Sequence, residues 1–264
     1  MPRFAANLSM MFTEVPFPQR FEAAARAGFT AVEFLFPYDF PAQDVARWLT
    51  DNDLRNVLFN LPPGDWAGGE RGCASIPGRE AEFLAAVERA LEYAERLGTP
   101  NLHAMAGIMP AGADRERHRT VYVSNIADAA RRAGKHGRTL LIEPINPRDI
   151  PGYFLNTQAE GHAIREEIGE PSLRVQMDFY HAQIVGGDLA MTFRKYFDGI
   201  GHVQVAGVPA RGEPDRGEVN YGYLFNLMDE LGYTGWVGCE YRPAGRTEDG
   251  LGWLNAWRQG RQTA

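Results

Sequence analysis

One pattern of hydrophobic and polar positions recurs along the chain: an amphipathic helical stretch, then a glycine, then a short apolar run. It is clearest in EAEFLAAVERALEYAERLG, residues 80–98. Phe83, Val87 and Leu91 recur there at helical spacing and predict one buried helix face. Gly98 is suited to the left-handed conformation that ends many helices, and the run NLHAM after it is typical of a strand.

The same order of elements returns along the whole chain. Seven helix-to-strand joins are predicted, and the opening run RFAANL adds an eighth strand. The joins are marked by Gly28, Asn52, Gly98, Gly137, Gly169, Gly199 and Gly232. Strands that alternate with helices imply parallel pairing, and eight such units in about 250 residues are typical of a closed (β/α)8 barrel. We therefore predict an α/β protein with a single TIM-barrel domain over residues 1–264.

An open, doubly wound sheet is the alternative architecture. It predicts a glycine-rich phosphate turn after the first strand, and NLSMMFTEVP, which stands there, has no glycine. The longest irregular stretch, residues 60–78, follows the third predicted strand and is rich in glycine. It is either a lid over a site or an ordinary surface loop, and the sequence does not decide between the two.

Oxygen-bearing side chains close four consecutive predicted strands: Glu143, Asp178, Gln204 and Glu240. The C-terminal ends of barrel strands meet on one face, where the active sites of such barrels lie, so we expect these side chains to face one another. Three crowded carboxylates repel, and a divalent cation removes that conflict. Oxygen ligands without thiolate or imidazole favour Mg²⁺ or Mn²⁺. The competing interpretation is that each acid caps a neighbouring helix.

Other polar residues at predicted strand ends have less definite roles. His103 and His181 are candidates for substrate contacts, with a structural histidine as the alternative. Glu33 stands apart from the other acids in the sequence, so we expect a helix cap or a salt bridge there. Asn7 and Asn60 are interpreted as structural.

The remaining histidines are expected to play no part in the site. His202 precedes Gln204 by two residues, so it should point into the barrel one layer lower, with a satisfied hydrogen bond. His118, His136 and His162 fall in helical stretches and are expected at the surface.

Composition narrows the classes of function. The chain has 264 residues, a net charge of −7 and no run rich in Lys or Arg. Nucleic acid is therefore excluded as a main partner, because phosphate binding needs a basic surface. Cys73 and Cys239 lie far apart, which favours a reducing compartment over a disulfide framework. No secretory leader pattern and no membrane span is evident, so we expect a cytoplasmic protein without a membrane partner. The oligomeric state stays open, a homo-oligomer included.

Four runs of the sequence together resemble a known family: LLIEPIN, VQMDFYH, GHVQVAGVPARGEPDRGEVNY and GCEYRP. They are similar to the hydroxypyruvate isomerase family, within the xylose isomerase-like barrels, and the resemblance extends over nearly the full chain. It implies an isomerase of a small keto acid or keto sugar with one divalent metal. The family's ligand pattern falls on Glu143, Asp178, Gln204 and Glu240. Related ketose epimerases have a histidine where this chain has Gln204.

The resemblance also implies roles in catalysis. Glu143 and Glu240 would be the acid/base pair, and His181 and Arg211 would contact the substrate, with Arg71 a second candidate for the substrate carboxylate. The implied reaction converts hydroxypyruvate to 2-hydroxy-3-oxopropanoate (tartronate semialdehyde), a step of carbohydrate and glyoxylate metabolism. A proton moves between adjacent carbons through an enediolate, whose charge the metal stabilises.

Several other functions remain open at this point. The same constellation suits the four-carbon acid 2-oxotetronate, and a ketose 3-epimerase or an inosose dehydratase would use a related barrel. A DNA-repair endonuclease is disfavoured, because it needs a histidine-rich zinc site and a basic groove. A non-catalytic barrel that only holds a cation is the alternative from another class.

Overall fold

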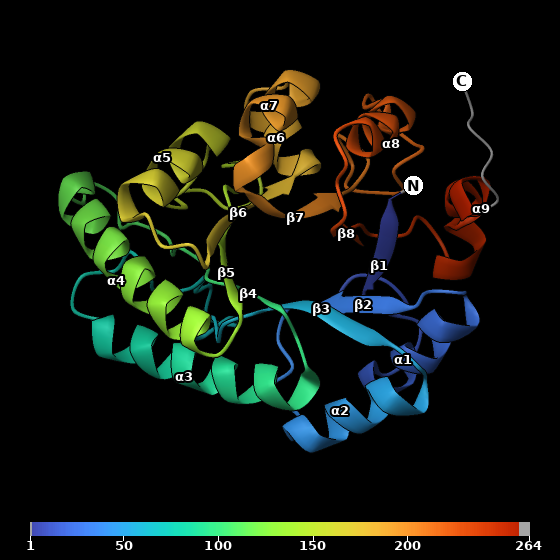
Figure 1. Ribbon diagram of the computed structural model, residues 1–264, viewed down its shortest axis with the longest axis horizontal. Helices are drawn as coiled ribbons and strands as arrows, with labels where there is room; N and C mark the ends of the chain where they lie inside the picture. Colours follow the sequence, from blue (N-terminus) through green and yellow to red (C-terminus); the bar gives the residue numbers. More distant parts are fainter. Residues whose placement is uncertain (1, 259–264) are drawn as a thin grey trace.

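Eight parallel strands form a closed barrel within residues 2–258, the part of the chain that the computed structural model describes. They pair in chain order, and β8 pairs with β1. The strands are β1 (Arg3–Asn7), β2 (Ala31–Phe34), β3 (Arg55–Asn60), β4 (Asn101–His103), β5 (Thr139–Ile142), β6 (Leu173–Asp178), β7 (Ile200–Val205) and β8 (Trp236–Cys239). The predicted TIM barrel is confirmed, with the strands at the centre and the helices around them (Figure 1).

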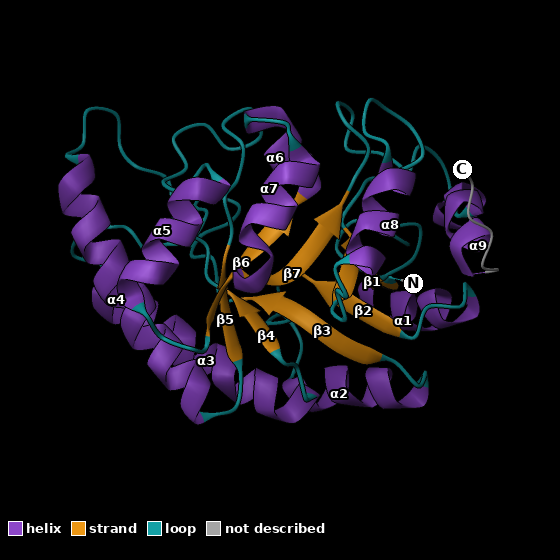
Figure 2. Ribbon diagram, turned by 45° about the horizontal axis from the view of Figure 1, so that its top comes forward, coloured by secondary structure: helices purple, strands orange, loops and turns teal. Residues whose placement is uncertain are grey.

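Helices follow the strands and cover the outside of the barrel (Figure 2). They are α1 (Phe17–Arg26), α2 (Ala42–Asp51), α3 (Glu80–Leu97), α4 (Arg115–Lys135), α5 (Gln158–Ile168), α6 (Phe179–Val185), α7 (Leu189–Tyr196), α8 (Tyr221–Glu230) and α9 (Gly252–Arg258). Two 3-10 turns, η1 (Phe197–Gly199) and η2 (Thr247–Gly250), complete the described elements. The apolar faces of these helices pack on the outward side chains of the strands, which is where the main core lies.

The interior of the barrel is polar at the level of the site. Glu33, Gln176, His202 and Gln204 all lie on strands and are at most 2% exposed. Glu33 on β2 makes hydrogen bonds to residues of β7, which is not its neighbour in the barrel, so these contacts cross the interior. Buried polar groups of this kind are stable only when they are hydrogen-bonded, and this network meets that requirement in large part.

Two of the predicted helix-to-strand joins differ from expectation. At the second join Asn52 has an ordinary negative φ, and the following Asp53 takes the left-handed conformation with φ 51°. At the sixth join Gly199 lies in a 3-10 turn instead of a left-handed cap. A Cβ there would lie 2.6 Å from Nδ1 of His162, so this glycine is needed for a close approach.

Residues 60–78 form a largely anchored loop. The amide of Ser75 donates to the carbonyl of Ala106 at 2.8 Å, which ties the second half of the loop to the segment after β4. Near the tip, Trp66 is 38% exposed and the guanidinium of Arg71 lies 3.8 Å from the centre of its ring. Both interpretations of this stretch, lid and surface loop, stay predictions.

Two of the three helical histidines are not at the surface as expected. His118 and His162 are buried, and only His136 is exposed. His162 stacks on Tyr196, with ring centres 4.2 Å apart. His118 shares a helix face with the buried Tyr122, so its spacing to that residue was the signal for burial.

Two other expectations concern the cysteines and the membrane. Cys73 and Cys239 are both buried, and neither forms a disulfide. Among the described helices, none is long and apolar enough to cross a membrane.

Candidate metal and active site

The side chains predicted at the strand ends gather around one cavity of about 380 Å³. Asp178 is the last residue of β6, Gln204 lies one residue before the end of β7, and Glu143 and Glu240 directly follow β5 and β8. All but Asp178 line the cavity, and Asp178 lies close to Glu143 and Glu240. The side chains therefore converge as expected. The ends of β5, β7 and β8 each differ by one residue from the predicted ends.

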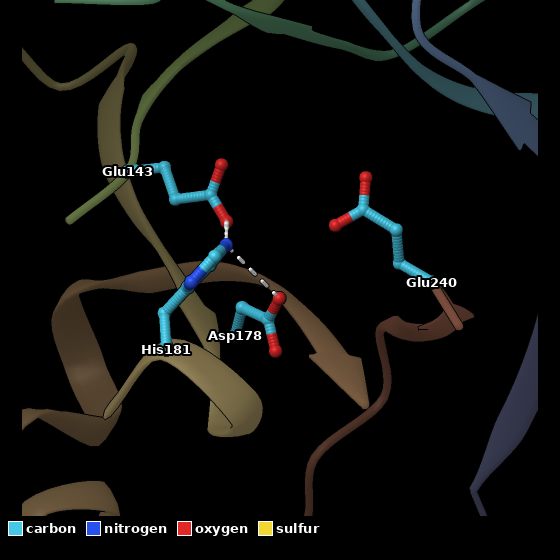
Figure 3. Close-up of side chains that lie close together, drawn as sticks. All are labelled: Glu143, Asp178, His181 and Glu240. Atoms are coloured by element: carbon cyan, nitrogen blue, oxygen red, sulfur yellow. Dashed lines mark ion pairs between the residues drawn. The ribbon is translucent and has the colours of Figure 1, made fainter. Parts of the chain in front are cut away.

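Three carboxylates and one imidazole come within reach of a common ion. Glu143, Asp178, His181 and Glu240 each offer one ligand atom, and these four atoms all lie within 4.8 Å of one another. Figure 3 shows Glu143 and Glu240 entering from opposite sides, with His181 below Glu143 and the Asp178 carboxylate between the two sides. His181 Nε2 lies 3.6 Å from Asp178 Oδ2 and 4.0 Å from Glu143 Oε1.

Burial and mutual repulsion dominate the electrostatics of the cluster. Burial raises the pKa of Glu240 to about 8, an effect that Arg211 opposes and Asp178 reinforces. Burial likewise raises the pKa of Asp178 to about 6. The pKa of Glu143 is raised well above its usual value by burial and then by the charges of Glu240 and Asp178. The pKa shifts bring these acids toward neutral pH, which is the range where acid/base catalysts work.

Two buried carboxylate oxygens of the cluster have no hydrogen-bond donor in the described part of the chain. Glu143 Oε1 and Asp178 Oδ2 are buried and receive no hydrogen bond from any described residue. Unpartnered buried carboxylate oxygens are costly, and a hard cation is the ligand that satisfies them. The residues present therefore fit a divalent metal ion.

Arg211 extends into the cluster from the loop after β7. Its Nη2 donates to Glu240 Oε2 at 2.7 Å, and its Nη1 donates to Asp149 Oδ2 at 3.0 Å. Burial alone would lower the pKa of this guanidinium, but Glu240, Asp178 and other acids raise it above its usual value. Arg211 is thus a fixed positive charge at the edge of the carboxylates, where the sequence placed a substrate contact.

His181 is the third residue of α6 and lies in its first turn. Its Nδ1 lies 2.6 Å from Asn146 Nδ2, and Asn146 Oδ1 accepts from the amide of Asp149 at 2.9 Å. Because this second contact fixes the direction of the Asn146 amide, Nδ1 is an acceptor and the hydrogen of the neutral ring is on Nε2. Burial, and then Arg211, lower the pKa of His181 well below its usual value, so the ring is neutral. An Nε2 that carries hydrogen is suited to a substrate oxygen and not to a metal.

His103 faces the same cavity from β4. Its Nδ1 is 3.2 Å from Asn60 Oδ1, and burial lowers its pKa to about 3. With Nδ1 as the donor, Nε2 is left as an acceptor that lies 3.7 Å from Glu143 Oε2. The ring in this orientation suits a substrate hydroxyl, in keeping with the expected substrate contact.

Sequence reasoning missed several residues that contact the site. Asn7, interpreted as structural, donates through Nδ2 to Glu33 Oε1 at 3.0 Å and to Glu240 Oε1 at 3.3 Å. Glu33 contacts His202, with Oε2 2.7 Å from Nε2, and it does not stand apart, because it also accepts a hydrogen bond from Gln204. A usable signal was that all of these residues lie on strands next to their C-terminal ends.

The comparisons with known proteins agree with this geometry. The family model for xylose isomerase-like TIM barrels matches residues 21–257. The 2-oxo-tetronate isomerase of Cupriavidus necator is 58% identical over 257 residues, which cover 97% of this chain and 99% of that protein. The hydroxypyruvate isomerase of Escherichia coli is 46% identical over 258 residues, which cover 98% of this chain and 100% of that protein.

A solved structure extends the likeness to three dimensions. The crystal structure described as AP endonuclease, family 2, from Brucella melitensis has a TM-score of 0.96 and 52% sequence identity, and covers 97% of this chain and 99% of that one. The two curated relatives are both isomerases, and identity at this level over nearly the full length shows that this chain is an isomerase as well. The chain belongs to the hydroxypyruvate isomerase family of the xylose isomerase-like TIM barrels.

Proposed function

We propose that the chain interconverts the adjacent carbonyl and hydroxyl groups of a short 2-keto acid, with hydroxypyruvate as substrate and 2-hydroxy-3-oxopropanoate as product. One observation supports this most. Glu143 and Glu240, two buried carboxyl groups with raised pKa, face one cavity from opposite sides. Such a pair is suited to moving a proton between neighbouring carbons of a bound keto acid.

One divalent cation, Mg²⁺ or Mn²⁺, is the proposed cofactor. Glu143, Asp178 and Glu240 would hold it through carboxylate oxygens, and Gln204 through its amide oxygen. When bound, the ion would polarise the substrate carbonyl and stabilise the negative charge of the enediolate. Three ligand charges of −1 also match a +2 ion, which relieves the repulsion within the cluster.

The protein's own groups move the proton. One of the two carboxylates, Glu143 or Glu240, removes a proton from C3 of the keto acid. A carboxyl group then returns a proton to C2, while the hydroxyl proton passes from the C3 oxygen to the C2 oxygen. The carbonyl thereby moves from C2 to C3, and no atom is gained or lost. Asp178 takes no part in these transfers and serves to bind the ion.

The substrate is held by the groups that surround the carboxylates. His181 Nε2 offers a hydrogen to a substrate oxygen, and His103 Nε2 accepts one from a hydroxyl. Arg211 is the first candidate for the substrate carboxylate, because its Nε is buried with no partner among the described residues. Arg71 also lines the cavity and is the second candidate.

The four-carbon acid 2-oxo-tetronate is the second candidate substrate. It has the same carbonyl and hydroxyl pair, with a CH₂OH group in place of one hydrogen on C3, so the same proton transfer applies. The cavity of about 380 Å³ has room for the extra group. The 58% identity to the Cupriavidus necator 2-oxo-tetronate isomerase, against 46% to the Escherichia coli hydroxypyruvate isomerase, favours it further.

Proton NMR in D₂O with both acids side by side tests the proposal. The enzyme with Mg²⁺ should turn over at least one of them and bring solvent deuterium to C2 of the product. The ratio of kcat/KM for the two acids then identifies the preferred substrate. If neither acid gains deuterium or changes, the proposed function is wrong. Ketoses in the same panel would reveal a 3-epimerase, which returns the proton to the carbon that lost it.

The endonuclease description of the Brucella melitensis structure is not carried over to this chain. An enzyme that cuts DNA needs a basic surface along the phosphates, and this chain has a net charge of −7 and an acidic cavity. We propose a cytoplasmic enzyme with a small-molecule substrate and no nucleic-acid partner. Light scattering would measure the mass in solution and show whether the protein forms a homo-oligomer.

A further inference from the structure

A fully buried carboxylate below the proposed metal site has no part in the reaction scheme above. Glu33, on β2, is 0% exposed. Its Oε1 accepts hydrogen bonds from Asn7 Nδ2 at 3.0 Å and from Gln204 Nε2 at 2.7 Å. Its Oε2 lies 2.7 Å from His202 Nε2. One carboxyl group therefore lies within hydrogen-bond distance of three nitrogen atoms in the interior of the barrel, where such contacts are stronger than in water.

The barrel is adapted locally to this side chain. At Gly238, on β8, a Cβ would lie only 2.3 Å from Glu33 Oε2, so no larger residue fits beside the carboxylate. The pairing of β2 with β3 shifts register between Val32 and Glu33, and that of β6 with β7 shifts between Val175 and Gln176. Such irregularities redirect side chains, and here each of them immediately precedes a member of the polar network.

The side-chain amide of Gln204 has one favoured orientation, and Glu33 determines it. Gln204 Nε2 donates to Glu33, while Gln204 Oε1 accepts from Gln176 Nε2 at 2.6 Å. A reversed Gln204 amide would place its oxygen 2.7 Å from a carboxylate oxygen and its nitrogen against the nitrogen of Gln176, so both contacts would become repulsive. Glu33 thus turns the amide oxygen of Gln204 away from itself. Gln204 and Gln176 both line the cavity.

A second branch of the network reaches the proposed acid/base pair. Asn7 Nδ2 donates both to Glu33 Oε1 and to Glu240 Oε1, the latter at 3.3 Å. Asn7 Oδ1 accepts from the amide of Ser9 at 3.0 Å, which fixes the direction of the Asn7 amide. The carboxylate of Glu240 is therefore held on one side by Arg211 and on the other by an amide that Glu33 anchors.

We propose that Glu33 is a positioning residue of the metal site. It presents the oxygen of Gln204, not the nitrogen, as the ligand atom, and through Asn7 it orients Glu240. The inference rests on the proposed function, because it needs Gln204 and Glu240 to bind the ion. Residues that orient metal ligands typically change metal affinity about 10- to 100-fold when they are replaced.

The test is the affinity for Mn²⁺, measured by titration calorimetry on chelator-stripped protein. Glu33→Gln has the same shape but only one acceptor oxygen for three donors, so the Gln204 amide is no longer fixed. We expect its Kd for Mn²⁺ to rise about 10- to 100-fold above that of the wild type. Gly238→Ala is the second variant, because its methyl group displaces the Glu33 carboxylate without changing it, and it should weaken Mn²⁺ binding as well.

Thr99→Val is the matched control. It removes another buried hydrogen bond of the barrel, from Thr99 Oγ1 to Asn56 Oδ1 at 2.6 Å, between residues that do not line the cavity. Its Kd for Mn²⁺ should equal that of the wild type.

Unchanged affinity in a folded Glu33→Gln protein overturns the inference and leaves the proposed function standing. Equal weakening in Thr99→Val overturns it too, because the effect would then be one of general stability. A wild-type protein that binds no Mn²⁺ overturns both the metal site and this inference.

Discussion

Replacing Glu240 by glutamine separates a catalytic role of this carboxyl group from a structural one. Glutamine has the same shape and cannot act as an acid or base. Glu240 Oε2 accepts from Arg211 Nη2 at 2.7 Å, and Oε1 accepts from Asn7 Nδ2 at 3.3 Å. The glutamine oxygen keeps the shorter contact, to Arg211, and only the longer one is lost. We therefore expect the Glu240→Gln variant to fold with its cavity intact.

The expected changes in rate and in stability have opposite signs. Loss of a general acid/base slows catalysis about 10²- to 10⁴-fold, which is about 3–5 kcal/mol in activation free energy. Burial raises the folded-state pKa of Glu240 from an ordinary 4.5 to about 8. The stability that protonated Glu240 confers on the metal-free protein is complete below pH 4.5 and is lost as the pH rises toward 8. The loss is about 3 kcal/mol at pH 7, and glutamine avoids it.

Two assays on the same preparations check this reasoning. Turnover is followed by proton NMR in D₂O with saturating Mg²⁺, and the free energy of unfolding is measured by urea melts in chelator at pH 7. We expect the variant to be slower by at least two orders of magnitude and, without metal, more stable than the wild type. Near-normal turnover would refute the catalytic role. A variant that is both inactive and strongly destabilised would show that the carboxyl group supports the fold.

Three further predictions follow from the same geometry. Removal of divalent ions by a chelator should abolish turnover, and Mg²⁺ or Mn²⁺ should restore it; full activity in metal-stripped protein would speak against the site. Because the pKa values of Asp178 and Glu240 are raised to about 6 and about 8, the metal-free protein should lose stability from pH 5 to pH 8, and Mn²⁺ should remove this loss. A flat profile in urea melts without metal would contradict the electrostatics. Asn146→Asp removes the hydrogen that fixes the His181 tautomer, so kcat/KM should fall about 10- to 100-fold, and a change below twofold would exclude this role.

The fold was predictable because its signals are local. Each strand-helix unit has its own periodicity and its own turn residue, as at Gly98, where φ is 68° as expected of a helix cap. The exact ends were less predictable, because glutamate at 143 and at 240 lies one residue beyond the last hydrogen-bonded position of the strand. The left-handed residue at the second join is Asp53 and not Asn52, since either type tolerates that conformation.

The site was predictable only in part, because some of its contacts follow from the order of the strands and others form only between distant residues in the folded barrel. The convergence of Glu143, Asp178 and Glu240 follows from topology alone, because consecutive strands of a barrel end on one face. The contacts of Glu33 do not, since they cross the barrel to β7 and depend on the register shift beside it. The tautomer of His181 depends on the neighbouring Asn146, which no pattern in the sequence connects with it.

Crystals of the protein soaked in Mn²⁺ and measured near the manganese absorption edge test the central claim most directly. The account predicts one strong anomalous peak among the carboxylates of Glu143, Asp178 and Glu240, with the amide oxygen of Gln204 beside it. A peak held by other residues, or no peak at a Mn²⁺ concentration that supports full turnover, would contradict it.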